Sequence, residues 1–254
     1  MKAEIIAIGS ELLTPDRVDT NSLYLTEKLN QAGFEVRLKT VVGDNEIDIA
    51  LLIRAALQRS TVIVLCGGLG PTEDDLTRRA IATALHRRLV LHEEILEALR
   101  RRFAARGARM AKINERQAEV IESAEVLDNP VGTAPGMWIE ADGAYLALLP
   151  GPPRELQAMF QSQVLPRAIR LGRGVELKKR VFGVQGLTES EVDTRIAPIY
   201  KTYSHIQTTI LAATGCISVR LQRWLEPGQQ PSDLEELAGK ISTELGAAIF
   251  TSAD

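Results

Sequence analysis

One stretch of the chain decides its fold class: Thr61-Val62-Ile63-Val64-Leu65-Cys66-Gly67-Gly68-Leu69-Gly70-Pro71-Thr72-Glu73-Asp74-Asp75-Leu76-Thr77. Its opening run is apolar or β-branched without interruption, which is typical of a strand buried on both faces. The glycines that follow allow positive φ and let a ligand approach the main chain closely. We expect a helix to begin near Asp75, so that its free N–H groups and dipole point at the same place. The stretch therefore predicts a phosphate-binding turn between a strand and a helix.

Strand and helix signals alternate on both sides of this stretch. We expect strands over 5–8, 34–42 and 61–65, helices over 20–32, 46–59, 76–86, 93–106 and 153–171, and a hairpin around Asp142-Gly143 over 137–149. Such alternation is typical of a parallel sheet covered by helices. Residues 1–172 are therefore predicted to form an α/β domain whose mostly parallel sheet is sandwiched between helices.

The pattern changes after a segment, 170–176, that contains two glycines and three charged residues and marks a domain boundary. Strands are expected over 178–184, 206–212, 217–224 and 247–251, and helices over 189–199 and 232–245. The resulting β-α-β-β-α-β order is typical of a small split α+β sandwich. Residues 176–254 are therefore predicted to form a second, smaller domain.

Composition excludes several classes of protein. The 254 residues are 45% hydrophobic and 25% charged, with a net charge of −3, so we expect a globular chain and no nucleic-acid partner. Cys66 and Cys216 lie far apart without metal-ligand spacing, which indicates a reducing compartment. No apolar run approaches the roughly 20 residues of a membrane helix, and the N-terminus does not resemble a signal peptide. We therefore expect a cytoplasmic protein without a membrane partner.

Three acidic residues, Glu73, Asp74 and Asp75, follow the glycines after Pro71 and Thr72. They would repel a phosphate group unless a divalent cation lay between them, and Mg²⁺ is commonly held by one or two carboxylates together with substrate phosphates. The alternative is that acidic residues here simply favour the first turn of a helix. The spacing matches neither the Walker loop nor the Rossmann fingerprint.

Six motifs, in this order, closely resemble those of the CinA (competence/damage-inducible protein) family. They are Gly9-Ser10-Glu11-Leu12-Leu13, Asp19-Thr20-Asn21, Val42-Gly43-Asp44-Asn45, the glycine stretch from Gly67 to Thr77, Asn129-Pro130-Val131-Gly132-Thr133-Ala134-Pro135-Gly136 and Leu149-Pro150-Gly151-Pro152-Pro153. The first domain also resembles the molybdopterin-handling proteins MogA and MoaB. The region after residue 176 resembles the family's middle domain. The resemblance further implies a homodimer.

In CinA-type proteins the first domain is associated with divalent-metal-dependent cleavage of ADP-ribose to AMP and ribose 5-phosphate. Many members carry a further C-terminal domain that deamidates nicotinamide mononucleotide. This chain ends at Asp254, about where that domain would begin. The resemblance therefore implies an ADP-ribose pyrophosphatase, and we do not expect the deamidase activity in this polypeptide.

The resemblance also assigns roles to particular residues. Asp75 and Asp44 align with the two functional aspartates of the MogA-type group. With Glu11 as a third acid, we expect them to be catalytic, and Asp75 and Asp44 to hold Mg²⁺, Mn²⁺ or Co²⁺ and activate water beside the pyrophosphate; K⁺ is a further candidate ion. The residues expected to contact the nucleotide are Gly67, Gly68, Gly70, Pro71, Thr72, Asn21, Thr133, Gly151 and Pro152.

Each of these assignments has a simpler alternative. Asp44 is also a turn former, Glu11 could satisfy backbone donors in its own loop, and Asn21 could cap the helix that follows it. The loops around Thr133 and Gly151 could serve rigid turn geometry alone. Cys66 stands where the family usually has threonine or serine, and it either weakens a phosphate contact or is a packed thiol.

Three functions remain open at this level. The favoured one is a metal-dependent hydrolase acting on ADP-ribose or a related nucleotide. The second is a protein that binds molybdopterin or transfers a nucleotide to it, and the third is a module that binds a nucleotide without turnover. Fold alone cannot separate them, because function resides in the site. The second domain and the Gly132-Thr133-Ala134-Pro135-Gly136 segment favour the CinA-type hydrolase over the molybdopterin function.

Overall fold

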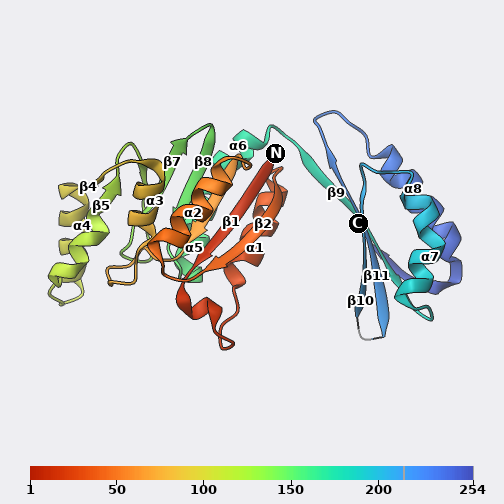
Figure 1. Cartoon of the computed structure of the whole chain (residues 1–254), viewed down its shortest axis with the longest axis horizontal. Coiled ribbons are helices and arrows are strands. Elements are labelled where there is room, and N and C mark those ends of the chain that lie inside the picture. Colours follow the sequence, from red (N-terminus) through yellow and green to blue (C-terminus); the bar gives the residue numbers. More distant parts are fainter. Residues whose placement is uncertain (214, 254) are drawn as a thin grey trace. The chain divides into compact units, whose positions relative to one another are not determined.

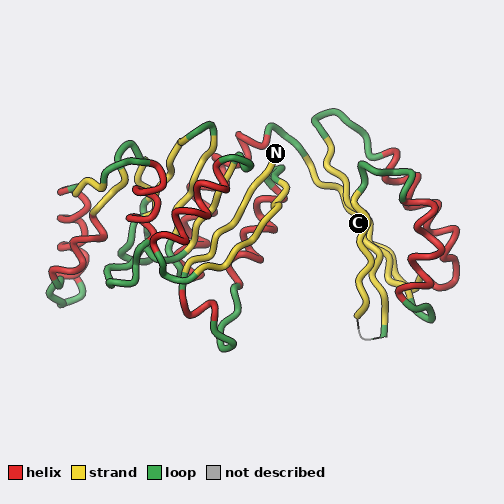
Figure 2. Tube along the Cα trace, viewed as in Figure 1, coloured by secondary structure: helices red, strands yellow, loops and turns green. Residues whose placement is uncertain are grey.

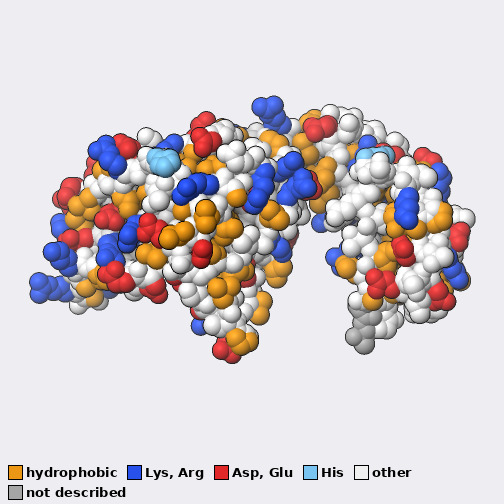
Figure 3. Space-filling model, viewed as in Figure 1, with side chains coloured by type: hydrophobic (Ala, Val, Ile, Leu, Met, Phe, Trp, Pro, Cys, Tyr) orange, Lys and Arg blue, Asp and Glu red, His pale blue; other side chains and the backbone are white. Residues whose placement is uncertain are grey.

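The chain divides into two units, Met1–Gly172 and Arg173–Asp254, each built around a sheet with helices (Figures 1 and 2). The computed structural model describes residues 1–213 and 215–253. Within these ranges, no helix combines the length and apolar character needed to cross a bilayer. Side chains of both charges occur across the visible face of each unit (Figure 3).

A six-stranded sheet organises the first unit, in the order β2-β1-β3-β8-β7-β6. Its strands are β1 (Lys2–Ile8), β2 (Glu35–Val42), β3 (Val62–Cys66), β6 (Glu125–Leu127), β7 (Gly136–Ala141) and β8 (Ala144–Leu149). Strands β2, β1, β3 and β8 pair in parallel, whereas β7 pairs antiparallel with β8 and β6. The mostly parallel α/β sheet predicted from the sequence is therefore confirmed.

Helices cover both faces of this sheet. They are α1 (Thr20–Gln31), α2 (Glu46–Leu57), α3 (Thr77–Leu85), α5 (Pro153–Met159) and α6 (Leu165–Gly172). Helix α4 (Glu93–Ala105) instead packs in a small separate core with Ala118. Successive side chains of a strand point to opposite faces. Ile6 and Leu65 accordingly enter the core with α2 and α3, and Ile5 and Val64 enter the core with α1 and α5. The central strands are thus buried on both faces, as their uninterrupted apolar sequence predicts.

Short elements complete the first unit. They are the 3₁₀ turns η1 (Ser10–Leu13) and η2 (Lys112–Ala118), the π turn η3 (Phe160–Val164), and the antiparallel pair β4 (Leu89–Leu91) and β5 (Glu119–Ile121). The helix predicted over 153–171 is therefore interrupted by η3 between α5 and α6. The predicted hairpin turn is present, with positive φ at both Asp142 and Gly143, as a tight two-residue turn requires.

The second unit is a four-stranded antiparallel sheet in the order β10-β11-β9-β12. Its elements are β9 (Glu176–Val184), α7 (Glu189–Tyr200), β10 (Gln207–Ala213), β11 (Cys216–Leu225), α8 (Ser232–Leu245), the 3₁₀ turn η4 (Gly246–Ala248) and β12 (Ile249–Ala253). One apolar core joins the sheet to α7 and α8. This is the β-α-β-β-α-β order predicted from the sequence.

Candidate functional site

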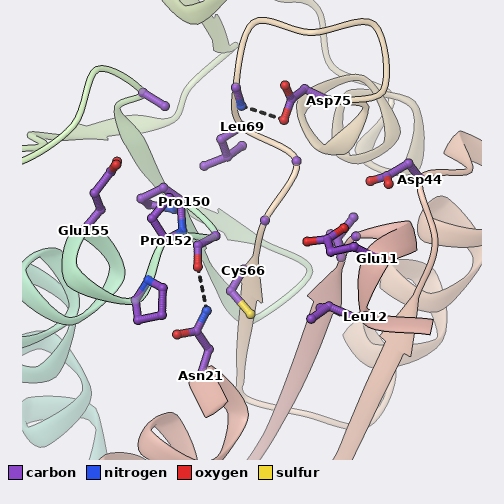
Figure 4. A pocket seen from close by; sticks show the side chains of 18 of the residues that line it. Glu11, Leu12, Asn21, Asp44, Cys66, Leu69, Asp75, Pro150, Pro152 and Glu155 are labelled. Carbon is purple, nitrogen blue, oxygen red and sulfur yellow. Dashed lines mark hydrogen bonds between the residues drawn. The ribbon is translucent and has the colours of Figure 1, made fainter. Parts of the chain in front are cut away.

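A cavity of about 750 Å³ lies at the carboxyl edge of the parallel strands of the first unit (Figure 4). Ile8 ends β1 and Cys66 ends β3, and both line it, as does Pro150 immediately after β8. In open α/β sheets ligands bind at this edge, because the loops that follow neighbouring strands meet there.

The glycine loop after β3 forms one wall of the cavity, and two of its residues can only be glycine. Gly67 has φ 106° and Gly68 has φ 65°. A Cβ atom on Gly67 would lie 2.0 Å from the carbonyl oxygen of Ile8, and one on Gly68 would lie 2.1 Å from Oγ1 of Thr77. The glycines were expected to let a ligand approach the main chain closely. In the structure, the atoms that approach it at these two positions are the carbonyl oxygen of Ile8 and the hydroxyl of Thr77.

Several loop N–H groups predicted to face the ligand are already engaged. The N–H of Gly67 donates to the carbonyl oxygen of Leu149 at 3.0 Å. The N–H groups of Gly70 and Thr72 donate to the two carboxylate oxygens of Asp75, at 2.8 and 2.9 Å. These three N–H groups therefore bond within the protein and are not free to bind a phosphate group.

Two other N–H groups remain available in the same loop. Among the described residues, neither the N–H of Gly68 nor that of Leu69 has a hydrogen-bond partner, and both residues line the cavity. The helix expected near Asp75 begins two residues later, at Thr77, because the Asp75 carboxylate folds back onto the loop. The donors therefore belong to the loop preceding α3.

Asp44 and Glu11 lie on one side of the cavity (Figure 4). The Asp44 carboxylate accepts the N–H of Ser10 through Oδ2 at 2.7 Å, and the N–H of Asp44 donates to Oγ of Ser10 at 3.0 Å. This reciprocal pair ties the loop after β1 to the loop after β2. In the part of the chain that the structure describes, Asp44 Oδ1 accepts no hydrogen bond, so it is free to bind a cation.

No group of three or more His, Cys, Asp or Glu side chains within residues 1–213 and 215–253 is arranged to hold a metal ion. The described residues therefore do not form a complete metal cage by themselves. A site built from one or two carboxylates and ligand phosphates is compatible with this donor set, because Mg²⁺ is commonly bound in that way.

Asn21, at the start of α1, links this helix to the loop after β8 on another side of the cavity. Its Nδ2 donates to the carbonyl oxygen of Gly151 at 2.8 Å (Figure 4), and its Oδ1 is buried without a partner among the described residues. The capping role considered for Asn21 belongs to Asp19, whose carboxylate accepts the N–H of Ser22 at 2.9 Å.

All but one of the predicted site residues line this cavity. They are Glu11, Asn21, Asp44, Gly67, Gly68, Gly70, Pro71, Asp75, Thr133, Gly151 and Pro152. Thr72 is exposed and does not line the cavity, because it turns toward Asp75 instead.

Sequence reasoning missed Glu155 and Gln117, which also line the cavity. Glu155 accepts a 2.7 Å hydrogen bond from Asn129 through Oε2, and its carboxylate occupies the space that a Cβ on Gly132 would fill. Gln117 is 2% exposed, and its Nε2 donates to Oγ1 of Thr133 at 3.2 Å. Glu155 follows the Pro150–Pro153 motif by two residues, so extending that motif would have found it. Gln117 belongs to no motif.

Cys66 lies in the cavity wall as a neutral, packed thiol. Burial, and to a smaller extent the negative charge of Asp19, raise the pKa of Cys66 to about 12. Its side chain belongs to the core shared with α1 and α5. Of the two alternatives for Cys66, the packed thiol is the one that agrees with this environment.

The fold and the glycine-loop cavity define a class of protein. Residues 4–170 match the family model described as "Probable molybdopterin binding domain". The match spans the six-stranded sheet, its helices and every loop of the cavity. The first unit is therefore a domain of this class.

The wider similarity is to CinA proteins. The chain is 50% identical over 252 residues to a CinA-like protein of Solibacter usitatus, covering 99% of this chain and 61% of the relative. It is 46% identical over 263 residues to a CinA-like protein of Koribacter versatilis, covering 99% and 62%. The crystal structure of the protein CinA from Thermoplasma acidophilum matches with a TM-score of 0.61 and 31% identity, over 66% of this chain and 99% of that one.

The chain belongs to the CinA family, as its six ordered motifs indicate. It spans about three fifths of the length of the curated relatives that it matches.

Proposed function

We propose that the first unit is a metal-dependent hydrolase that cleaves the pyrophosphate of ADP-ribose, or of a related nucleotide, to AMP and ribose 5-phosphate. One observation carries the proposal: carboxylates and unpaired backbone N–H groups line the same cavity. Among the described residues, Asp44 Oδ1 on one side and the N–H groups of Gly68 and Leu69 in the glycine loop have no hydrogen-bond partner. A cavity with both features suits a phosphate-bearing ligand together with a cation.

Asp44 and Asp75 are the proposed metal ligands. The Asp75 carboxylate already accepts the N–H of Gly70 and both the N–H and the hydroxyl of Thr72, so one of its about four acceptor positions remains for a cation. Mg²⁺, Mn²⁺ or Co²⁺ held there with phosphate oxygens would supply charge neutralisation and a more acidic bound water. K⁺ stays a further candidate ion, and Glu11 is the proposed third acid beside them.

The remaining residues bind and orient the nucleotide in this proposal. The N–H groups of Gly68 and Leu69 would donate to one phosphate group. Thr133, Gly151 and Pro152 line the rest of the cavity and would contact the other parts of the ligand. Asn21 fixes the loop that bears Gly151 through its 2.8 Å hydrogen bond.

The test follows AMP release from ADP-ribose by metal-stripped protein after addition of Mg²⁺, Mn²⁺ or Co²⁺ in the presence of K⁺. We expect turnover that depends on the divalent ion and is lost in Asp44→Asn and Asp75→Asn. Asp48→Asn is the matched control, because Asp48 is exposed on the first turn of α2 and does not line the cavity. Folded protein that releases no AMP with any of these ions would reject the hydrolase.

Binding measurements beside this assay separate two other functions. The match to a probable molybdopterin-binding domain favours a pterin ligand as the second candidate. Molybdopterin binding tighter than that of ADP-ribose, without AMP release, would support it. AMP binding without turnover would instead support a nucleotide-binding module. A homodimer also stays a prediction, which light scattering of the purified chain tests.

A further inference from the structure

A buried asparagine, Asn129, closes the loop between β6 and β7, which forms part of the cavity wall. It is 3% exposed. Its Oδ1 accepts the N–H groups of Val131 and Gly132, at 3.1 and 2.7 Å. Its Nδ2 donates to the carbonyl oxygen of Ala134 at 2.8 Å and to Oε2 of Glu155 at 2.7 Å. A side-chain amide has two donors and two acceptor positions, so Asn129 uses all four.

This network fixes one carboxylate oxygen of Glu155 and leaves the other for a ligand. Among the described residues, Glu155 Oε1 accepts no hydrogen bond, and no basic side chain pairs with the carboxylate. Gly132 makes this position possible, because a Cβ atom there would overlap the carboxylate. Glu155 lines the cavity on a different side from Asp44 and Glu11 (Figure 4). The cavity wall therefore carries an unpaired carboxylate that is held in a defined place.

The charge of Glu155 limits which part of a ligand can lie beside it. An ionised carboxylate only accepts hydrogen bonds, and it repels a phosphate group unless a cation lies between them. A phosphate group has donors elsewhere in the cavity, in the N–H groups of Gly68 and Leu69, which have no partner among the described residues. The part of the ligand beside Glu155 should therefore be neutral and should carry hydrogen-bond donors.

Ribose meets both conditions. It is neutral, it carries hydroxyl donors, and in each half of ADP-ribose it is the group next to a phosphate. A phosphate held by the glycine loop therefore brings a ribose close to it, whereas the base lies further away. Carboxylates bind ribose hydroxyls in dinucleotide-binding folds, and hydrogen bonds to an ionised acceptor are about twice as strong as those between neutral groups.

We infer that Glu155 accepts hydrogen bonds from ribose hydroxyl groups of the ligand, and that Asn129 holds its carboxylate in the position that allows this. Glu155 then sets the preference of the cavity for ligands that contain ribose. The inference rests on the proposed function only in that the ligand carries both phosphate and ribose, and it does not require hydrolysis.

The experiment compares ligands that differ only in their ribose hydroxyl groups. AMP is paired with its dideoxy analogue, and ribose 5-phosphate is paired with 2-deoxyribose 5-phosphate, so that the two riboses of ADP-ribose are tested separately. Dissociation constants are measured by calorimetry on the full chain at one fixed Mg²⁺ concentration. We expect the hydroxyl-bearing member of at least one pair to bind at least about tenfold more tightly.

Two substitutions of Glu155 test whether this preference depends on its carboxylate. Glu155→Met removes the acceptor, so we expect the preference to be lost. Glu155→Gln nearly keeps the shape, but its single amide oxygen faces the Asn129 donor, so an NH₂ group replaces Oε1. We expect the preference to fall at least about fivefold in this variant. Binding of the analogues that lack the hydroxyl groups should change little.

Glu140→Gln is the matched control, because Glu140 is exposed on β7 and does not line the cavity. It removes the same charge from the first unit, and its ligand preference should equal that of the unmodified chain. Circular dichroism and thermal melting report whether each variant folds. If Glu155→Met does not fold, Glu155→Gln carries the test, because it changes the volume of the side chain least.

Three results would overturn the inference. The first is a folded Glu155 variant with the same preference as the unmodified chain. The second is a variant that weakens both members of each pair equally, because Glu155 would then hold a cation or only support the loop. The third is an unmodified chain without a preference in either pair. Failure of the hydrolase proposal looks different: the preference and its loss would be observed while ADP-ribose is not cleaved.

Discussion

Asn21 Nδ2 donates a 2.8 Å hydrogen bond to the carbonyl oxygen of Gly151, 130 residues further along the chain. The bond joins the start of α1 to the loop after β8, and both residues line the cavity. It therefore ties these two segments together at the cavity.

Asn21→Ala should loosen this closure. We expect a loss of stability of about 1 kcal/mol and a severalfold rise in KM for ADP-ribose, because one partly buried hydrogen bond to the loop disappears. Thermal unfolding and steady-state kinetics measure the two effects. Asn30→Ala is the control, because Asn30 lies on the same helix and does not line the cavity. An unchanged KM in Asn21→Ala would show that the bond does not position the loop.

Asp75→Asn should destabilise the protein even without metal. The Asp75 carboxylate accepts the N–H groups of both Gly70 and Thr72, whereas an asparagine amide offers only one acceptor atom. We expect a loss of about 1–3 kcal/mol in the free energy of unfolding of the metal-free chain, measured by urea denaturation.

Asp44→Asn is the comparison for this measurement. Its remaining oxygen can still accept the N–H of Ser10, so we expect a stability change within about 0.5 kcal/mol of zero. If Asp75 were only a metal ligand, the two variants would be equally stable in the absence of metal.

Arg102→Ala should weaken ligand binding from outside the cavity. The Arg102 guanidinium donates to the carbonyl oxygens of Gly132 and Asn129, the latter at 3.0 Å, and so holds the loop that bears Thr133. We expect a loss of about 1–3 kcal/mol in stability, since two bonds from a charged donor are lost, and a higher KM with kcat changed less.

Arg101→Ala serves as the control for Arg102→Ala. Arg101 is the preceding residue of α4, its side chain is 74% exposed, and it approaches Glu97 at 3.8 Å. An exposed pair of this kind contributes about 0–1 kcal/mol, so this variant should behave like the unmodified chain. Equal effects of the two substitutions on KM would contradict the proposed support of the Thr133 loop.

We expect Glu4 to make the free energy of unfolding depend on pH in the acidic range. Burial tends to raise the pKa of Glu4, but hydrogen bonds from Arg59 and Ser60 outweigh it and hold the pKa below its usual value. A carboxyl whose pKa is lower in the folded state stabilises the protein above its unfolded pKa, and that stabilisation is lost as pH falls through the folded pKa.

Glu4→Gln should accordingly be less stable than the unmodified chain at pH 7. The difference should shrink as the pH falls below the usual glutamate pKa of 4.5. Urea unfolding of both proteins between pH 7 and acidic pH measures it. A difference that stays constant over this range would show that the charge of Glu4 does not contribute.

Cys66 should resist alkylation in the folded chain. Because its pKa is raised to about 12 and its residue is 2% exposed, almost no accessible thiolate exists at pH 8. Cys216 is partly exposed and should react first with iodoacetamide. Mass spectrometry of the modified peptides compares them, with urea-unfolded protein as the control in which both react. Equal rates in the folded chain would contradict the burial of Cys66.

Much of the fold could be predicted because its signals are local. The uninterrupted run before Cys66 indicates a strand buried on both faces, and Asp142-Gly143 indicates a tight turn, since both depend on backbone preference and side-chain period within a few residues. Two local predictions differ from the structure: the helix over 153–171 is interrupted by the π turn η3, and the helix expected near Asp75 begins at Thr77. There the Asp75 carboxylate bonds back to Gly70 and Thr72, and no local propensity distinguishes that from the first turn of a helix.

The sequence by itself determined the order of the longer helices and strands, the glycine turn and a set of site residues, all of which except Thr72 line the cavity. Only the tertiary structure decided which of their polar groups are free. The carbonyl oxygen of Leu149 accepts the N–H of Gly67, and the N–H of Ser10 donates to one carboxylate oxygen of Asp44. These bonds join segments that the sheet brings together. A polar group that is already bonded within the protein is not available to a ligand, so the contacts between distant segments decide which groups can bind one.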